Sequence, residues 1–277
     1  MAQWLGENPW RQGHLLAPES ARILELFHLK SPDDTAVMVI SHDCDLAQSV
    51  ETEPICEVIV GRKILRQEGN FANAKSIRRL HLKMSTASDG VAIIELDAGA
   101  KALIEKGSLA SHVPDGSFAL DVSEGTILRA WLGARYNRAS FPDEFDRRLT
   151  KEANKAYGKL LKIFKATSDD IIAVFFDVDG GKEVDRAGPD DTYSLAIYLL
   201  FSAETDPEKA KRTAAAAAES ITKIFREHFL VQHKWQNIEL VSCEVTAESE
   251  MSVRASRLFK RWHLDYISLR EDQPVLP

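Results

Sequence analysis

The sequence predicts an α+β protein made of two modules. Residues 1–112 are expected to form a small β-rich module, an SH3-like barrel or sheet, and residues 118–277 a ferredoxin-like module of order β-α-β-β-α-β. Short β-branched runs crowd the first hundred residues, whereas long apolar stripes with helical spacing occur only in the second half. A chain of 277 residues is also near the size at which a single core gives way to two.

Short apolar runs bounded by polar turns predict the strands of the first module. The run 55–61 alternates Ile55, Glu57 and Ile59 with apolar partners, as a half-buried strand does. The turn-rich stretch 110–117 contains Pro114 and Asp115-Gly116, and it predicts the boundary between the modules. The predicted strands are 21–29, 36–41, 55–61 and 91–96.

The second module is predicted from two helical stripes set between apolar strands. The first stripe runs from Phe145 to Phe164 behind Asp143 as N-cap, and the second follows Asp206-Pro207, a strong helix start. Both helices are expected to pack on the same face of the sheet. The predicted strands are 118–122, 126–136, 171–176, 193–201 and 238–246.

Composition excludes several classes of protein. With 44% hydrophobic and 28% charged residues, the chain resembles a globular protein and not a disordered one. Cys44, Cys56 and Cys243 form no CxxC pair, which favours free thiols in a reducing compartment. The polar N-terminus and the absence of an 18-residue apolar stretch predict a cytoplasmic protein without a membrane segment.

The sequence Ser41-His42-Asp43-Cys44-Asp45 follows a predicted strand and is the first candidate site. Two chemical interpretations are a Cys44 nucleophile activated by His42, and a zinc ion held by His42, Cys44 and Cys56. The alternative, which we favour, is a structural turn in which the aspartates bond the backbone and Cys44 packs as a small apolar residue.

The acidic loop after the strand 171–176 is the second candidate site. Asp177, Asp179 and Glu183 could hold Mg²⁺ and take part in catalysis, since Mg²⁺ prefers oxygen ligands. By analogy alone, palm-type nucleotidyl transferases and cyclases carry metal-binding acids at this place in a ferredoxin-like sheet. Aspartate and glycine are also common in turns, so a solvated loop is the favoured alternative.

Basic residues near aromatic ones form the third candidate, a nucleic-acid or nucleotide interface. Arginines beside an aromatic ring can bind phosphate and stack on a base. The alternative is a set of exposed arginines paired with Asp143, Glu144 and Asp146. The candidate contacts are Arg129, Arg135, Tyr136, Arg138, Lys260, Arg261 and Trp262.

Two motifs in the first 60 residues carry a family resemblance. Gln12-Gly13-His14-Leu15 and Ser41-His42-Asp43-Cys44-Asp45-Leu46 resemble the opening of a group of uncharacterised bacterial proteins, although His14 stands where an acid is usual. The same layout is similar to MazF-type toxin barrels, which implies an SH3-like barrel that binds or cleaves RNA. The catalytic pattern of those toxins is not recognisable, so the resemblance assigns no catalytic residue.

The leading functional hypothesis is a bacterial protein that recognises nucleic acid or nucleotides, with cleavage by the loop carboxylates and a metal as its extension. Such a protein would suit a toxin or phage-defence system. The first alternative is a non-catalytic sensor or assembly module that binds a protein partner encoded nearby. The second is an enzyme that depends on Cys44.

Overall fold

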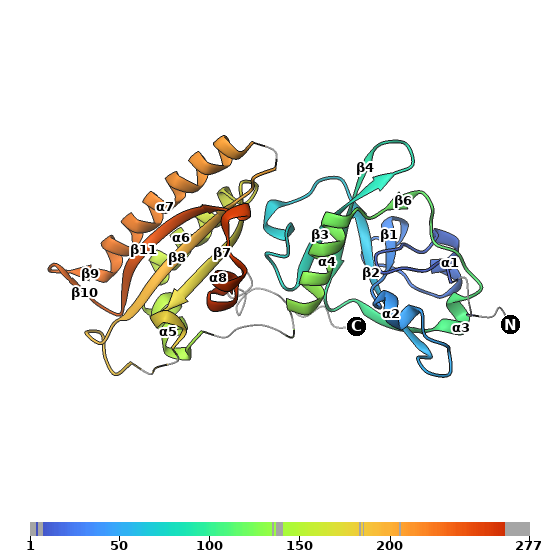
Figure 1. Ribbon diagram of the computed structural model, residues 1–277, viewed down its shortest axis with the longest axis horizontal. Coiled ribbons are helices and arrows are strands. Elements are labelled where there is room, and N and C mark those ends of the chain that lie inside the picture. The colour runs from blue at the N-terminus through green and yellow to red at the C-terminus, as the bar shows by residue number, and fades with distance from the viewer. Residues whose placement is uncertain are drawn as a thin grey trace. The chain divides into compact units, whose positions relative to one another are not determined.

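The protein is a mixed α+β chain of two compact units, Met1–Tyr136 and Asn137–Pro277 (Figure 1). The computed structural model describes residue 4 and residues 8–134, 136, 141–182, 184, 186–204 and 206–263. Each unit has its own sheet and its own hydrophobic core.

The N-terminal unit is built on a curled antiparallel sheet of order β1-β2-β4-β3-β6. The long strand β2 organises it, because β1 lies along one edge of β2 while β5 and then β4 lie along the other. The strands are β1 (Thr35–Val39), β2 (Ile55–Ile64), β3 (Arg79–Thr86), β4 (Val91–Asp97), β5 (Lys101–Glu105) and β6 (Phe118–Ala119).

Alternate residues of these strands contribute to two hydrophobic cores, one on each face of the sheet. On one face Met38 and Ile59 pack with Leu128 and Trp131 of helix α4 (Val122–Ala134). On the other face the strands pack against the N-terminal segment and three short helices. These helices are α1 (Pro18–Ile23), α2 (Asp43–Leu46) and α3 (Lys106–Leu109).

Two of the predicted strands in this part of the chain are wrong. The segment 21–29 contains the end of α1 followed by irregular chain, and the segment 126–136 is the greater part of α4 and not a strand. Asp121 caps the N-terminus of α4 by accepting a hydrogen bond from the Glu124 backbone N–H (3.0 Å). This cap favours a helix, although the alternation of polar and apolar residues over 126–136 suggested a strand. Because α4 and β6 pack on β3, the first unit extends to Tyr136, past the predicted boundary at 110–117.

The C-terminal unit has a mixed sheet of order β11-β8-β7-β12. Strand β8 (Tyr193–Phe201) is antiparallel to β7 (Ile171–Val178) and parallel to β11 (Ile238–Ala247), and β12 (Lys260–Trp262) is antiparallel to β7. A small hairpin of β9 (Leu230–Val231) and β10 (Lys234–Trp235) follows helix α7. The helices are α5 (Asp143–Arg147), α6 (Asn154–Ala166), α7 (Pro207–Phe229) and α8 (Val253–Leu258).

Helices α6 and α7 cover one face of this sheet and share its core (Figure 1). Ala214, Ala217 and Ala218 let α7 approach the strands closely, and Asp206 caps the helix by accepting from the Lys209 backbone N–H (3.0 Å). The predicted helix 145–164 is interrupted by a π-helical turn over Arg148–Glu152. No described helix is long and apolar enough to cross a membrane.

Five predicted strands are confirmed as β1, β2, β4, β7 and β8, and the strand at 238–246 is confirmed as β11. The β-α-β-β-α-β order is not found among the described residues, because its first strand is α4 and the fourth strand of the sheet, β12, comes from the C-terminal side. Of the strand predicted at 118–122, only β6 (Phe118–Ala119) is found, and strands β3, β5, β9, β10 and β12 had no prediction.

Candidate nucleic-acid interface and acidic groove

In the acidic loop between β7 and β8, Arg186 forms ion pairs with two carboxylates of the same loop, those of Asp179 and Asp191. The Asp179 carboxylate accepts hydrogen bonds from Arg186 Nη2 (2.6 Å) and from the Ser194 backbone N–H (2.9 Å). Asp191 accepts from the Ala187 backbone N–H and from Arg186 Nη1 (2.9 Å), and these bonds lower its pKa in that order of importance. The hydrogen bonds of these two carboxylates therefore stabilise the conformation of the loop.

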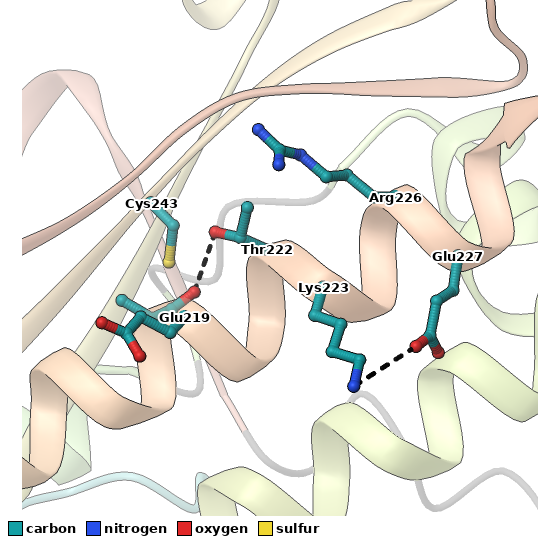
Figure 2. Close-up of a pocket in the computed structure, with 7 residues that line it drawn as sticks. Glu219, Thr222, Lys223, Arg226, Glu227 and Cys243 are labelled. Atoms are coloured by element: carbon teal, nitrogen blue, oxygen red, sulfur yellow. Dashed lines mark hydrogen bonds and ion pairs between the residues drawn. The ribbon is translucent and has the colours of Figure 1, made fainter. Parts of the chain in front are cut away.

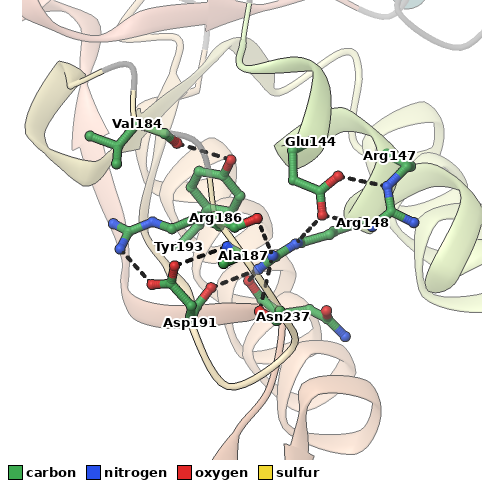
Figure 3. Close-up of polar contacts among 10 residues, drawn as sticks. Glu144, Arg147, Arg148, Val184, Arg186, Ala187, Asp191, Tyr193 and Asn237 are labelled. Carbon is green, nitrogen blue, oxygen red and sulfur yellow. Dashed lines mark hydrogen bonds and ion pairs between the residues drawn. The ribbon is translucent and has the colours of Figure 1, made fainter.

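Arg148 also fixes the same loop (Figure 3). Its side chain is 1% exposed and donates to the Glu144 carboxylate (2.7 Å) and to the carbonyl oxygens of Asp191 (2.8 Å) and Gly188 (3.0 Å). Its guanidinium also lies 5.2 Å from the centre of the Tyr193 ring. The loop is thus anchored to α5, β8 and the core.

The predicted magnesium ligands do not form a metal site in the described part of the chain. No group of three or more His, Cys, Asp or Glu side chains there is arranged to hold a metal ion. The Asp179 carboxylate is paired with Arg186. Asp177 lies on β7, and one of its carboxylate oxygens is buried without a hydrogen-bond partner. Glu183 lies outside the described residues.

The His42–Asp45 turn and the Gln12-Gly13 motif meet in space. Gln12 donates through its backbone N–H to Asp43 Oδ1 (2.8 Å) and through Nε2 to the Ile40 carbonyl (2.9 Å). Gly13 follows with φ +91°, a value that favours glycine, and its N–H donates to the Val39 carbonyl (2.8 Å). The two motifs therefore join the N-terminal segment to the end of β1.

His42 and the cysteines do not converge. His42 caps α2, and its Nδ1 accepts from the Cys44 backbone N–H (3.2 Å). Cys44 is exposed, whereas Cys56 lies in the core, where burial raises the pKa of its thiol to about 11. Of the structural interpretation, the bond from the backbone to Asp43 is found, but Cys44 is exposed and does not pack as a small apolar residue. The three predicted zinc ligands form no metal cluster among the described residues.

Lys106 supports this turn and was missed by sequence reasoning. Its side chain is fully buried, and Nζ donates to the carbonyl oxygens of Asp45 (2.5 Å) and Gln48 (3.2 Å). The Trp4 ring lies 5.6 Å from Nζ. A lone lysine at the end of a strand gives no sequence signal of burial, because lysine is almost always exposed.

Beside the turn lies a groove of about 440 Å³, which we call the acidic groove. Its exposed carboxylates belong to Asp45, Glu53 and Glu57, and its apolar surface includes Leu103 of β5. Lys101 Nζ lies 5.8 Å from the centre of the Tyr136 ring, which is 81% exposed. The remaining lining comes from Gln12, Ile40, Ser41, His42, Ile55 and Leu132.

The predicted nucleic-acid contacts belong to both units, and those that the structure describes differ in exposure. Trp262 is 6% exposed and stacks on Phe176 within the core, and burial lowers the pKa of Arg261 to about 10. Lys260 extends over the Phe141 ring. Tyr136 lines the acidic groove, Arg129 is exposed on α4, and Arg135 and Arg138 lie outside the described residues.

A strongly basic surface exists instead on helices α6 and α7. Nine exposed lysines and arginines, against three glutamates, lie on these two helices, and we call them the cationic layer. Because both helices cover the same sheet face, their solvent-exposed sides form one surface. The layer consists of Lys155, Lys159, Lys162, Lys165, Lys209, Lys211, Arg212, Lys223 and Arg226.

A hollow of about 530 Å³ lies along the C-terminal half of α7, next to β11 (Figure 2). Lys223 and Arg226 line it together with Glu219 and Glu227. Cys243 lies at its strand side, where burial raises the pKa of the thiol to about 12 and keeps it neutral. The hollow adds a concave strip to the cationic layer.

In comparisons with known proteins, the chain matches no family model, no curated protein and no solved structure.

Proposed function

We propose that the protein binds nucleic acid without sequence preference, through contacts between the cationic layer and backbone phosphates. The supporting observation is the excess of exposed cations on α6 and α7. Three of the nine form ion pairs, namely Lys159 and Lys223 with Glu227, and Lys209 with Asp170. The other six have no carboxylate partner within the described residues.

Such a surface suits phosphate binding for two physical reasons. Each phosphate that a lysine or arginine neutralises releases condensed counterions, which supplies the affinity of sequence-independent binding. The aromatic residues of the two helices, Tyr157, Phe164, Phe225 and Phe229, are all buried, so none is available to stack on a base. Contacts to the backbone are therefore the mode that this surface supports.

A salt titration tests the proposal directly. The affinity of the full chain for a fluorescent duplex DNA and for a single-stranded RNA would be measured by anisotropy at several salt concentrations. We expect Lys162→Gln with Arg212→Gln to weaken binding to both and to reduce the slope of log K against log salt by about 2 for the duplex, one for each lost contact.

The matched control is Arg22→Gln with Lys30→Gln, which removes the same charge from exposed positions of the N-terminal unit. This control is expected to retain the full salt slope. No binding at low salt, or an equal loss in both double variants, would contradict the proposal.

The arginines predicted from the sequence provide a second comparison. If Arg135→Ala with Arg138→Ala abolishes binding while the α6–α7 variant binds normally, the interface lies at those arginines and not on the cationic layer. Cleavage would require more than binding, because Asp179 would first have to leave Arg186 and Ser194 to coordinate a metal.

A further inference from the structure

The acidic groove of the N-terminal unit has the opposite charge to the cationic layer. Asp45, Glu53 and Glu57 contribute three carboxylates, and Lys101 is the single ammonium among its lining residues. None of the three carboxylates forms a hydrogen bond or an ion pair with the rest of the described chain, although the buried Lys106 interacts electrostatically with Glu53 and Asp45. Their field therefore favours a cationic ligand and repels phosphate.

Strand β5 borders the groove and has one edge that no described strand covers. The Val60 N–H donates to the Ala100 carbonyl, and the Lys106 N–H donates to the Pro54 carbonyl. In an antiparallel pair the hydrogen-bonded positions alternate, so positions 102 and 104 also face β2, whereas the N–H and C=O groups of Lys101, Leu103 and Glu105 point away from it. This edge can accept an added strand.

The side chain of Leu103 strengthens this interpretation. It is 67% exposed and lines the groove beside Glu57, its cross-strand neighbour on β2. A strand added to β5 would place every second side chain on this face, where the aliphatic stem of a lysine or arginine can contact Leu103 and its charged end can reach the carboxylates. The intervening apolar side chains would lie on the opposite face, beside Ala102 and Ile104.

We infer that the groove and the free edge of β5 bind an extended segment of a partner protein in which basic and apolar side chains alternate. Main-chain hydrogen bonds to Leu103 and Glu105 would supply affinity, and the carboxylates would select lysine or arginine. This site lies in the N-terminal unit, so it does not depend on the nucleic-acid interface proposed for the C-terminal unit.

A peptide of four Lys-Val repeats, acetylated, amidated and fluorescently labelled, is the probe. We expect saturable binding to the full chain, weakened about tenfold by Glu53→Gln with Glu57→Gln, which is about 1.4 kcal/mol. The matched control, Glu19→Gln with Asp33→Asn, removes two exposed carboxylates away from the groove and is expected to bind normally.

Amide hydrogen exchange separates strand addition from charge attraction alone. On binding the peptide, the backbone N–H groups of Leu103 and Glu105 should gain protection, and Leu103→Pro should abolish binding because it removes one donor. The exchange measurement uses the unaltered protein, so it tests strand addition at β5 even if the proline variant does not fold.

Several outcomes would overturn the inference. They are the absence of binding at about 1 mM peptide, equal binding by the groove variant and its control, and unchanged protection of the β5 amides. Competition by RNA for the groove would assign it to a polyanion instead. Self-association that Leu103→Pro removes would make a second copy of the chain the occupant.

Discussion

Arg148 and Lys106 are buried cations that use backbone carbonyl oxygens as their main partners. Arg148 joins the acidic loop to the core, and Lys106 holds the turn beside the groove. Each would be costly to bury without these bonds, because a charged group loses its hydration there. Each residue thus stabilises one unit by satisfying several carbonyl groups at once.

Two neighbouring arginines allow the contribution of Arg148 to be measured. Both Arg147 and Arg148 bond Glu144, but the Arg147 side chain is 46% exposed. We expect Arg148→Met to lower the free energy of unfolding by about 3 kcal/mol or more, since it leaves buried carbonyl groups unpaired. Arg147→Met should cost less than about 1 kcal/mol. Urea unfolding of both variants gives the comparison, and similar losses would refute the structural role of Arg148.

Glu95 makes the stability of the N-terminal unit sensitive to acid. A hydrogen bond from His81, supported by Arg62 and Arg79, lowers its pKa from 4.5 to about 2. The carboxylate therefore contributes its full stabilisation above pH 4.5, and that contribution is lost as the pH falls towards 2. Glu95→Gln should be less stable than the wild type near neutral pH. In urea unfolding the difference should shrink below pH 4.5, and a constant difference would contradict this assignment.

For single residues, the sequence predicted where a turn or loop lies more accurately than which contacts its side chains make. The turn at His42–Asp45 was located, but its structural interpretation holds for Asp43, which accepts a backbone hydrogen bond, and not for Cys44, which is exposed. The inward position of Trp262 and the pairing of Asp179 with Arg186 depend on strand pairing and loop closure, which local composition does not encode.

Among the elements, α4 shows how a periodic pattern can mislead. Alternation over Ile127, Arg129 and Trp131 suggests a strand, but Leu128 and Trp131 are three apart and pack inward from one helix. Strands such as β1 and β8 were predicted correctly because their β-branched or apolar runs are too short for a buried helix. Strand β3 was obscured by the charged residues that share its solvent-facing side.

The packing of α4 gives a prediction about chain fragments. Residues 1–136 should fold alone with a cooperative unfolding transition, because they include Leu128 and Trp131 of the core. A fragment of residues 1–112 should not, because it leaves one face of the sheet uncovered. Circular dichroism during urea unfolding would compare them, and cooperative folding of the shorter fragment would show that α4 is dispensable.

For the whole molecule, the net charge of −7 hides an uneven distribution. Removing the nine cations and three glutamates of α6 and α7 from the totals of 35 and 42 leaves 26 against 39, a net charge of −13 for the remainder. A net negative charge disfavours a protein whose whole surface binds nucleic acid, but it permits a local basic surface. Only the packing of two helices on one sheet face brings these lysines together.

This segregation of charge has a practical consequence for handling the protein. An ion-exchange resin interacts with the nearest charged surface and not with the average over the molecule. At neutral pH and low salt, the cationic layer offers a surface to a sulfonate resin, while the acidic remainder offers one to a quaternary-ammonium resin. The protein should therefore be retained by both columns, although its isoelectric point of about 5.7 suggests only the second.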